Sequence, residues 1–304
     1  MPPIETRQIK ALGREVSLLG FGTSQIGNTD HSMDSVNLIK PELSNNILSY
    51  VIGCGINLLD TGPHYGTAET QIGQILNQTA GNSVLVATKS KASNLGNRSF
   101  SLPSLRQNLN ISRSRLGFNT LVLFQVNKPS LSSLRSKKLY QFLYQLKKEN
   151  LIDYSGIIVG DIEAGFHAIK YGGVDTIQVL YNLIYQETES LIEFAYKNNV
   201  GVIVRSPLNS GFLSGAYKMD TTFNPMDERS KFFSGEKFRL RLNSLKNIQK
   251  ELGISDADLL NFSLGFVFSK KDVSSVIPAA SKISQLTNYI EAARNYFSIK
   301  PAER

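Results

Sequence analysis

The sequence has little cysteine, no tryptophan and few histidines: one Cys, no Trp and three His in 304 residues. The lone Cys54 cannot form a disulfide within the chain, which is typical of proteins from a reducing compartment. It lies in the small apolar stretch Val51–Gly55, where a buried, unreactive thiol is the simplest interpretation. No Cys, His and carboxylate residues share the spacing of metal ligands, so we expect no metal site.

Long hydrophobic runs and targeting segments are also missing. No apolar run reaches the roughly 18 residues that a membrane helix needs, and Met1–Thr6 lacks the basic and apolar segments of a signal peptide. We therefore expect a cytoplasmic protein with no membrane partner. The glycines form neither a Walker nor a Rossmann fingerprint after a strand, which excludes those nucleotide-binding motifs.

Basic residues outnumber acidic ones, which gives a formal net charge of +8. Such a charge could steer an anionic ligand, for example a phosphate-bearing cofactor, or a nucleic acid. The Lys and Arg residues are scattered, however, and the densest cluster, Arg135–Lys138, begins an amphipathic helical pattern. We interpret this cluster as a solvated face and expect no nucleic-acid partner.

Short apolar runs rich in β-branched residues alternate with helical patterns along the whole chain. Eight runs are predicted strands: Val16–Gly22, Ile56–Leu59, Val84–Thr88, Leu121–Val126, Tyr154–Val159, Thr176–Tyr181, Gly201–Arg205 and Ser274–Ile277. Nine stretches are predicted helices: Ser44–Ile52, Ala68–Gln78, Leu102–Leu116, Leu131–Lys148, Glu163–Tyr171, Glu187–Asn198, Glu236–Leu252, Asp256–Ser269 and Ser284–Tyr296. Ser44 and Ser255 are the expected N-caps.

This alternation predicts a parallel sheet covered by helices. Eight such units in about 300 residues favour a closed (β/α)8 barrel over an open sheet, and no linker divides residues 1–304 into domains. The segment Gln8–Val16 predicts a short hairpin with its turn at Leu12–Arg14. It precedes the barrel and could plug its N-terminal end.

Four polar side chains stand at or just past the ends of successive predicted strands: Asp60, Tyr65, Lys89 and Asn127. Because the active site of a parallel barrel gathers at the carboxyl ends of its strands, we expect them to converge. An ammonium beside a phenol favours the phenolate, and a carboxylate keeps the ammonium charged. The trio Asp-Lys-Tyr would therefore serve as a general acid for a carbonyl oxygen. The alternative is a structural Asp–Lys ion pair beside a tyrosine at the edge of the core.

With these residues in place, the chain resembles the aldo-keto reductase family. The motifs that carry the resemblance occur in order along nearly the whole chain: Leu19–Thr23, Gly55–Gly66 followed by Glu69, Ile72, Gly73 and Leu76, Ala87–Lys89, Ile177–Gln178 with Tyr181–Asn182, Arg205–Leu208 with Gly211, Leu213 and Gly215, and Ser275–Ala280 followed by Gln285–Leu286.

The resemblance implies a reductase of aldehydes or ketones that uses NADPH on a (β/α)8 barrel. By position, Tyr65 would be the proton donor, tuned by Lys89 and Asp60. Gln178 would bind the nicotinamide carboxamide, Arg205 would stack on the nicotinamide, and the backbone of Leu208–Ser214 would hold the pyrophosphate. The full set of expected cofactor positions is Gly22, Thr23, Asp60, Gln178, Arg205, Ser206, Pro207, Leu208, Gly211, Ser214, Ala279, Ser281, Lys282 and Gln285.

The chain departs from the family at the fourth catalytic position, where Asn127 replaces a histidine. Leu116-Gly117 before it and Pro129 after it fix this alignment. An Asn amide can donate a hydrogen bond to a carbonyl oxygen, but it cannot titrate. The substitution therefore indicates either an altered choice of substrate or a weakened activity. His64, next to Tyr65, could also lean into the site and replace the imidazole.

Two cofactor positions depart as well. Ile158 and Val159 stand where the family has polar side chains that grip the carboxamide. Ser281, with Lys282 beside it, stands where the family presents Arg or Lys to the 2'-phosphate. NADH is therefore an alternative to NADPH.

The substrate pocket is expected between three loops, Ser24–Pro41, Asn127–Ser133 and Tyr217–Ser234. Their polar residues favour a hydroxylated carbonyl substrate such as a sugar derivative: Asp30, His31, Asp34, Lys218, Asp220, Asp227, Arg229 and Lys231. The sequence thus predicts a nicotinamide-dependent carbonyl reductase. Its rival is a cofactor-binding barrel with impaired catalysis that acts as a sensor or accessory subunit.

Overall fold

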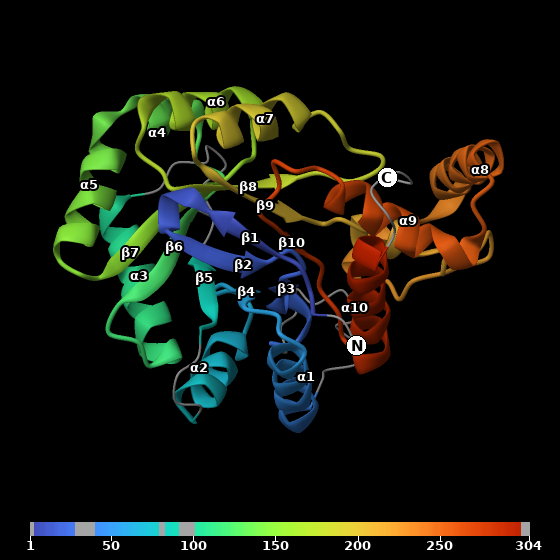
Figure 1. The fold of residues 1–304 in the computed structure, drawn as a ribbon, viewed down its shortest axis with the longest axis horizontal. Helices are drawn as coiled ribbons and strands as arrows, with labels where there is room; N and C mark the ends of the chain where they lie inside the picture. The colour runs from blue at the N-terminus through green and yellow to red at the C-terminus, as the bar shows by residue number, and fades with distance from the viewer. Residues whose placement is uncertain (1–2, 28–39, 79–82, 91–100, 299–304) are drawn as a thin grey trace.

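The computed structural model describes residues 3–27, 40–78, 83–90 and 101–298. Over these residues, eight strands form one parallel sheet in which each strand pairs with the next along the chain. The strands are β3 (Phe21–Gly22), β4 (Leu58–Asp60), β5 (Leu85–Lys89), β6 (Leu121–Asn127), β7 (Ile152–Ile158), β8 (Thr176–Leu180), β9 (Gly201–Arg205) and β10 (Ser275–Ile277). The predicted (β/α)8 barrel is confirmed, with its helices outside the sheet (Figure 1).

The sheet closes where the first strand meets the last. Parallel bridges join Leu19 to Val276 and Gly22 to Ala279, and the Gly20 N–H donates to the Val276 carbonyl at 2.8 Å. Glycine leaves room for this seam, because a Cβ on Gly20 would lie 2.9 Å from the side chains of both Ile277 and Ser275. The close approach of the two backbones therefore completes the barrel.

A hairpin precedes the barrel and covers one of its ends. It consists of β1 (Thr6–Ile9), the short helix η1 (Lys10–Leu12) and β2 (Arg14–Ser17). Because Thr6 pairs with Ser17 in this hairpin, the predicted first strand is divided: its first part belongs to β2, and its end forms β3 and the seam with β10. Ile9, Leu12 and Val16 pack on interior residues of the barrel strands, and a Cβ on Gly201, the first residue of β9, would lie 2.5 Å from Ile9. The hairpin therefore plugs the N-terminal end.

Ten α-helices are found in the described residues: α1 (Pro41–Gly53), α2 (Ala68–Gln78), α3 (Leu102–Leu116), α4 (Leu131–Arg135), α5 (Lys137–Lys148), α6 (Ile162–Tyr171), α7 (Glu189–Lys197), α8 (Gly235–Leu252), α9 (Asp256–Phe268) and α10 (Ile283–Ser298). The predicted helix Leu131–Lys148 is broken at Ser136, whose backbone is extended. Ser255 caps α9 as predicted. Ser44 is not an N-cap, because it lies inside α1 and its hydroxyl donates to the Ile26 carbonyl.

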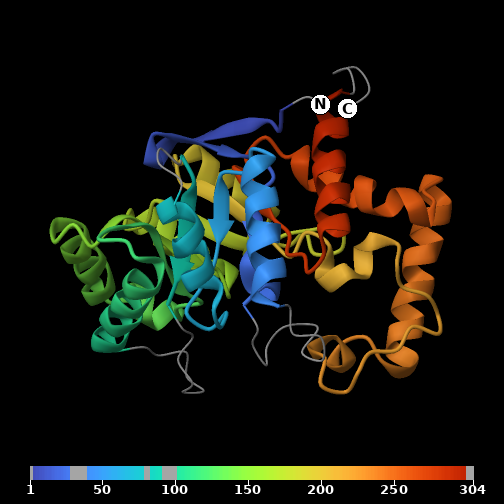
Figure 2. The same cartoon turned by 90° about the horizontal axis from the view of Figure 1, so that it is seen from below.

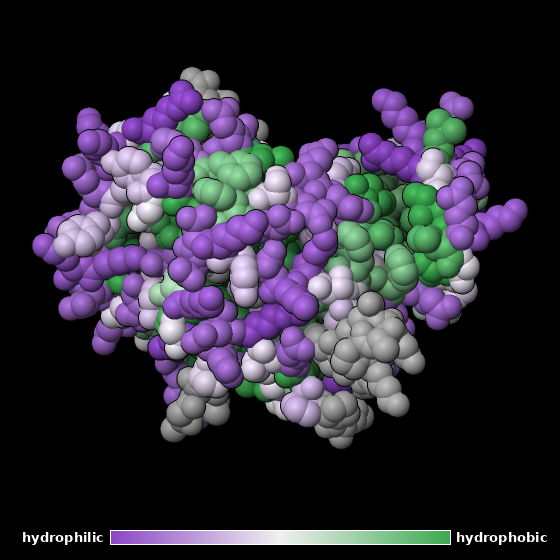
Figure 3. Space-filling model, turned by 45° about the horizontal axis from the view of Figure 1, so that its top comes forward, coloured by the Kyte–Doolittle hydropathy of each residue, from purple (hydrophilic) through white to green (hydrophobic). Residues whose placement is uncertain are grey.

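The main hydrophobic core fills the layer between the sheet and its helices, and a smaller cluster fills the barrel interior beneath the hairpin. In Figure 2 the hairpin lies at the top edge, and the orange segment between β9 and α8 lies at the bottom edge. Figure 3 shows an apolar patch on the side where Figure 1 places α8 and α9; α8 exposes Leu240, Ile248 and Leu252. No helix in the described part of the chain combines the length and hydropathy needed to cross a membrane.

Candidate active site

Asp60 and Lys89 end two neighbouring strands, and their side chains meet at the C-terminal end of the barrel. The Lys89 ammonium donates to Asp60 Oδ1 at 2.5 Å and to the Tyr65 hydroxyl at 3.1 Å. Asp60 and Lys89 are each only 3% exposed. The structure therefore brings three of the four predicted catalytic residues into one hydrogen-bonded group.

This group keeps the ammonium charged. Burial lowers the pKa of Lys89, but the charge and hydrogen bonds of Asp60 and Tyr65 outweigh it and raise that pKa to about 12. The ammonium also lies 4.7 Å from the centre of the Tyr65 ring. A fixed positive charge is thus held next to a phenol that faces a cavity.

Two glutamines hold the other oxygen of Asp60. Gln178 Nε2 donates to Asp60 Oδ2 at 2.8 Å, and Gln125 Nε2 approaches the same oxygen at 3.3 Å. Gln178 also lines the cavity, where a ligand can reach it. Gln125 is fully buried and was not among the predicted site residues. Its signal was a polar residue inside an apolar strand, two positions before Asn127 and so on the same strand face.

Asn127 ends β6 opposite Ile158 and is half-buried. Its backbone N–H donates to the Ser90 hydroxyl at 3.0 Å. Within the described residues, the lining of the cavity beside Tyr65 does not include Asn127. The fourth predicted residue therefore also ends its strand, two positions past the residue that pairs with Lys89, but it does not join the hydrogen-bonded group of Asp60 and Lys89.

His64 packs against the proposed proton donor from the side. Its ring lies 4.4 Å from the Tyr65 ring in an edge-on arrangement. It does not line the cavity in the described part of the chain. Of the predicted substrate-loop residues, Asp30, His31 and Asp34 lie outside the described residues.

A cavity of about 290 Å³ opens beside Tyr65 at the ends of β3, β8, β9 and β10. Most predicted cofactor positions line it: Gly22, Asp60, Gln178, Arg205, Ser206, Pro207, Leu208, Gly211, Ala279, Ser281 and Gln285. Further lining residues come from segments that the sequence also indicated: Ser24 and Gln25 from the first substrate loop, Ser210 from the loop Leu208–Ser214, Arg229 from the third substrate loop, and Ile277, Pro278 and Ala280 from the motif Ser275–Ala280. Tyr289, on α10, also lines the cavity and was not indicated.

Three predicted cofactor positions do not line this cavity. The Thr23 hydroxyl donates to the Asp60 carbonyl at 3.0 Å and is buried. The Ser214 hydroxyl donates to the Gly211 carbonyl at 2.6 Å. Lys282 is exposed at the start of α10. Thr23 and Ser214 thus support the backbone of the cavity wall.

The cavity wall after β9 is a loop with an unusual backbone that contains the short helix η3 (Asn209–Ser214). Ser206, Asn209 and Ser210 have φ values of 53°, 46° and 56°. Such left-handed conformations cost energy outside glycine and cluster at ligand sites. Gly211, at φ 89°, leaves room for the Tyr217 hydroxyl, which a Cβ would approach to 2.8 Å.

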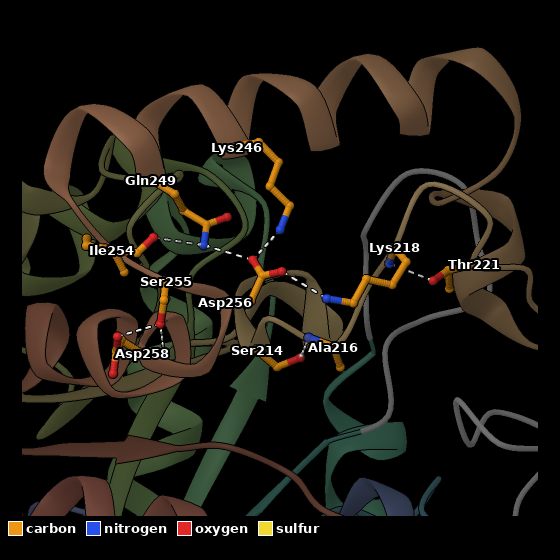
Figure 4. Close-up of polar contacts among 10 residues, drawn as sticks. All are labelled: Ser214, Ala216, Lys218, Thr221, Lys246, Gln249, Ile254, Ser255, Asp256 and Asp258. Carbon is orange, nitrogen blue, oxygen red and sulfur yellow. Dashed lines mark hydrogen bonds and ion pairs between the residues drawn. The ribbon is translucent and has the colours of Figure 1, made fainter.

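Asp256, the first residue of α9, anchors the far end of this loop (Figure 4). Its carboxylate accepts from Lys218 at 2.9 Å, from Gln249 at 3.0 Å, and from Lys246. The hydrogen bonds from Lys246 and Lys218 hold the pKa of Asp256 far below its usual range. Gly215 fits directly against Asp256, since a Cβ there would lie 1.9 Å from the Asp256 carbonyl oxygen.

Two guanidinium groups face the cavity. Arg205 ends β9, and its buried Nε has no hydrogen-bond partner among the described residues. Burial lowers the pKa of Arg205, partly offset by Tyr65 and Asp60. Arg229 binds Asp227 through Nε and Nη2, the latter at 2.6 Å, and stacks on Phe223 at 4.9 Å. An unpaired buried donor in a cavity wall indicates a place for a polar or aromatic ligand.

Ser281 and Gln285 form another part of the cavity wall. Gln285 Oε1 accepts from the backbone N–H groups of Ser281 and Lys282, at 3.0 and 3.2 Å. In the described residues, no group of three or more His, Cys, Asp or Glu side chains could hold a metal ion. The cradle of left-handed residues and the unpartnered Arg205 Nε fit a flat, phosphate-bearing organic cofactor.

Comparison with known proteins gives a consistent result. Residues 18–304 match the model of the aldo/keto reductase family. NADH-specific methylglyoxal reductase from Escherichia coli (strain K12) is 25% identical over 257 residues, which cover 79% of each chain. L-galactose dehydrogenase from Arabidopsis thaliana is 23% identical over 98% of this chain and 91% of the relative. The holo form of an aldo-keto reductase from Bacillus halodurans has a TM-score of 0.75 at 21% identity, covering 97% of this chain and 95% of that one.

Proposed function

We infer the function of this chain from its family: it belongs to the aldo/keto reductase family, whose model spans residues 18–304. We propose that it reduces an aldehyde or ketone to an alcohol with a nicotinamide cofactor. The observation that carries this proposal is the Lys89 ammonium, which is bound to both Asp60 and Tyr65 beside a cavity.

The proposed chemistry assigns one role to each member of the trio. Tyr65 donates its hydroxyl proton to the carbonyl oxygen of the substrate. Lys89 stabilises the phenolate that remains, and Asp60 keeps Lys89 charged and oriented. When bound, the cofactor supplies the hydride that adds to the carbonyl carbon. Arg205 and Gln178 would hold its nicotinamide ring, and the loop Leu208–Ser214 would hold its phosphates.

We propose NADPH as the cofactor, with NADH as a close competitor. The close competition is supported by the cavity wall near Ser281. There, Gln285 Oε1 already accepts the backbone N–H groups of Ser281 and Lys282, and the Lys282 side chain is exposed. A 2'-phosphate would then meet one exposed lysine and no buried arginine of this segment. We expect dissociation constants for NADPH and NADH within about tenfold of each other, which is about 1.4 kcal/mol. Fluorescence titration with both nucleotides checks this, and a hundredfold preference for either would contradict it.

The substrate is proposed to be a hydroxylated carbonyl compound such as a sugar derivative. Support comes from the polar residues of the loop after β9, where Arg229 lines the cavity and Asp227 binds it. L-galactose dehydrogenase among the relatives is consistent with such a substrate. A panel of carbonyl compounds tests the proposal, which fails if only flat hydrophobic ketones are reduced.

Replacing Tyr65 with Phe is the decisive experiment. We expect turnover to fall by about a hundred- to ten-thousand-fold, because the proton donor is lost, while the dissociation constant of the cofactor stays within twofold. Tyr144→Phe is a matched control, since Tyr144 is exposed and also has a lysine ammonium, 5.1 Å from its ring.

The rival function is a cofactor-binding barrel with little or no catalysis. It is favoured by Asn127, which stands at the family's histidine position and does not line the cavity in the described residues. This rival predicts cofactor binding by the unmodified protein with no turnover of any carbonyl, and no effect of Tyr65→Phe.

A further inference from the structure

We propose that Glu69 and Arg115 form a positioning pair that holds the loop of Tyr65 in place against Lys89. The proposal rests on the proton-donor role proposed for Tyr65. Both residues lie outside the cavity, on the helices α2 and α3 that follow β4 and β5. Through contacts on the helix-facing side of the sheet, they connect β5, which carries Lys89, to the loop that carries Tyr65.

The route begins at β5, where adjacent residues face opposite sides of the sheet. Lys89 faces the barrel interior and binds Asp60 and Tyr65. Thr88 faces the helices, and its hydroxyl donates to Glu69 Oε1 at 2.7 Å. Glu69 is therefore hydrogen-bonded to β5 at the residue just before Lys89.

Glu69 is a fully buried carboxylate near the start of α2. Its other oxygen, Oε2, lies 3.6 Å from Arg115 Nη1. A buried charge is costly unless it is compensated, and Arg115 offsets it through the ion pair alone, because Oε2 accepts no hydrogen bond among the described residues. The pair therefore holds the Arg115 side chain, which is 38% exposed, next to Glu69.

Arg115 completes the route on the loop of the tyrosine. Its Nη1 donates to the Pro63 carbonyl at 2.8 Å. Proline has no N–H group, so its carbonyl is the backbone atom through which this point of the loop can be held. Two residues further, the Tyr65 N–H donates to the Gly62 carbonyl at 2.9 Å. The Pro63 contact thus fixes the turn that presents the phenol.

The two helices are close enough for this pair because of Gly73. A Cβ on Gly73 would lie 2.4 Å from the Leu116 carbonyl oxygen. The end of α3 therefore rests on the backbone of α2, with Arg115 next to the contact. The alternative role for the pair is a plain ion pair that only fastens α2 to α3.

The test compares Arg115→Met with Arg106→Met in the full chain. Arg106 is a matched control: it lies on the same helix, is also 38% exposed, and binds a glutamate, Glu149, at 2.6 Å. We expect Arg115→Met to speed amide hydrogen exchange over residues 61–68 by about tenfold, because a fixed carbonyl anchor is lost. Arg106→Met should leave that segment unchanged.

Kinetics provide the second measurement. We expect Arg115→Met to lower kcat for carbonyl reduction by about ten- to a hundredfold, since small misplacement of a reacting group has that effect. The dissociation constant of NADPH should stay within twofold. Arg115→Lys keeps the charge beside Glu69 and should recover part of the lost kcat. Glu69→Gln keeps an acceptor for Thr88, so its kcat should lie between those of Arg115→Met and Arg115→Lys. This variant also tests the proposal if Arg115→Met does not fold.

Equal exchange over residues 61–68 in both Met variants would overturn the proposal and leave a plain helix–helix ion pair. So would a fall in kcat matched by an equal loss of NADPH binding. If the unmodified protein reduces no carbonyl compound, the proposed function fails, and hydrogen exchange alone then decides whether the pair holds the loop.

Discussion

At the scale of single residues, the site depends on how many hydrogen bonds the Asp60 carboxylate accepts. One carboxylate oxygen binds Lys89, and the other receives Gln178 and Gln125. A buried ion pair is worth little or is unfavourable unless its remaining hydrogen-bonding capacity is met. Gln125 on β6 and Gln178 on β8 provide the remaining hydrogen bonds to Asp60. The position of Lys89 therefore depends on β4, β6 and β8 as well as on β5.

Asn127→His tests the most unusual position of the chain. Gln125, two residues earlier, points into the barrel, so residue 127 lies on the inward face of the strand. An imidazole there can both donate and titrate. We expect kcat/KM for simple aldehydes to rise about tenfold or more, measured against an Asn127→Gln control that keeps an amide. Loss of turnover on the preferred substrate, with no gain on aldehydes, would show instead that Asn is needed for that substrate.

Asp256 should make stability depend on acid pH. Hydrogen bonds from Lys246 and Lys218 lower its pKa in the folded chain, relative to about 3.9 when unfolded. Its stabilisation is therefore present above the unfolded pKa and is lost as pH falls from about 5 through the folded value. We expect Asp256→Asn to lower Tm at pH 7 and to flatten the fall of Tm below pH 5. Asp258→Asn, in the same helical turn, is the control; identical curves for both variants would contradict the assignment.

At the scale of elements, contacts between neighbours override local preference. The apolar positions of residues 131–148 have one continuous helical period, yet the chain is extended at Ser136 and starts a second helix there. The hydroxyl of Ser44 is used inside α1 on the Ile26 carbonyl and not at the helix start. For Ser44 the partner comes from tertiary packing, which helix propensity does not describe.

Gly73→Ala tests the contact between α2 and α3. The added methyl group would meet the Leu116 carbonyl at 2.4 Å, and this partner is backbone that cannot turn away. We expect the free energy of unfolding to fall by about 1–3 kcal/mol, as for other overpacked sites. Gly53→Ala is the control, since its Cβ would meet nothing within 4 Å; a gain of about 0.4–1 kcal/mol is expected there. Denaturant titration measures both, and equal effects would rule out the close contact.

At the scale of the whole molecule, the two ends of the barrel have separate tasks. The hairpin fills the N-terminal end with Ile9, Leu12 and Val16, while the cavity and the trio lie at the C-terminal end. The Arg7 guanidinium attaches the hairpin to the end of α9 and to the segment after it by donating to the carbonyls of Phe268, Lys270 and Val273, each at 2.7 Å. Phe268 ends α9, so Arg7 also donates to one of the last carbonyls of that helix.

Arg7→Met should therefore reduce stability without changing catalysis. Charged hydrogen bonds contribute about 1.5–3 kcal/mol each and are not additive, so we expect a loss of about 3 kcal/mol in the free energy of unfolding. The kcat should stay within twofold, because the clamp is at the opposite end from Tyr65. Arg14→Met, an exposed residue of the same hairpin, is the control. A large fall in kcat at temperatures where the variant is folded would show that the two ends are coupled.

Much of the architecture could be predicted from local pattern. Strands buried on both faces need near-continuous apolar runs, and at β4, β5 and β6 a polar residue after the run marks the end of the strand. Asp60 and Lys89 were found in this way, and they lie where the pattern placed them. Gln125 was missed because a single polar residue in an apolar strand does not reveal which partner satisfies it. The division of Val16–Gly22 was missed because pairing with Thr6 and Arg7 depends on the hairpin register.

The sequence by itself determined the barrel, its hairpin and the residues that end its strands, because period and polarity are local properties of the chain. Only the tertiary structure decided which of those residues meet. It joined Asp60, Tyr65 and Lys89, left Asn127 outside their group, and placed Gln125 and Gln178 on the free carboxylate oxygen. The physical reason is that these contacts depend on sheet register, on barrel closure at Gly20 and on the left-handed loop after β9, all of which are set by residues distant in the chain.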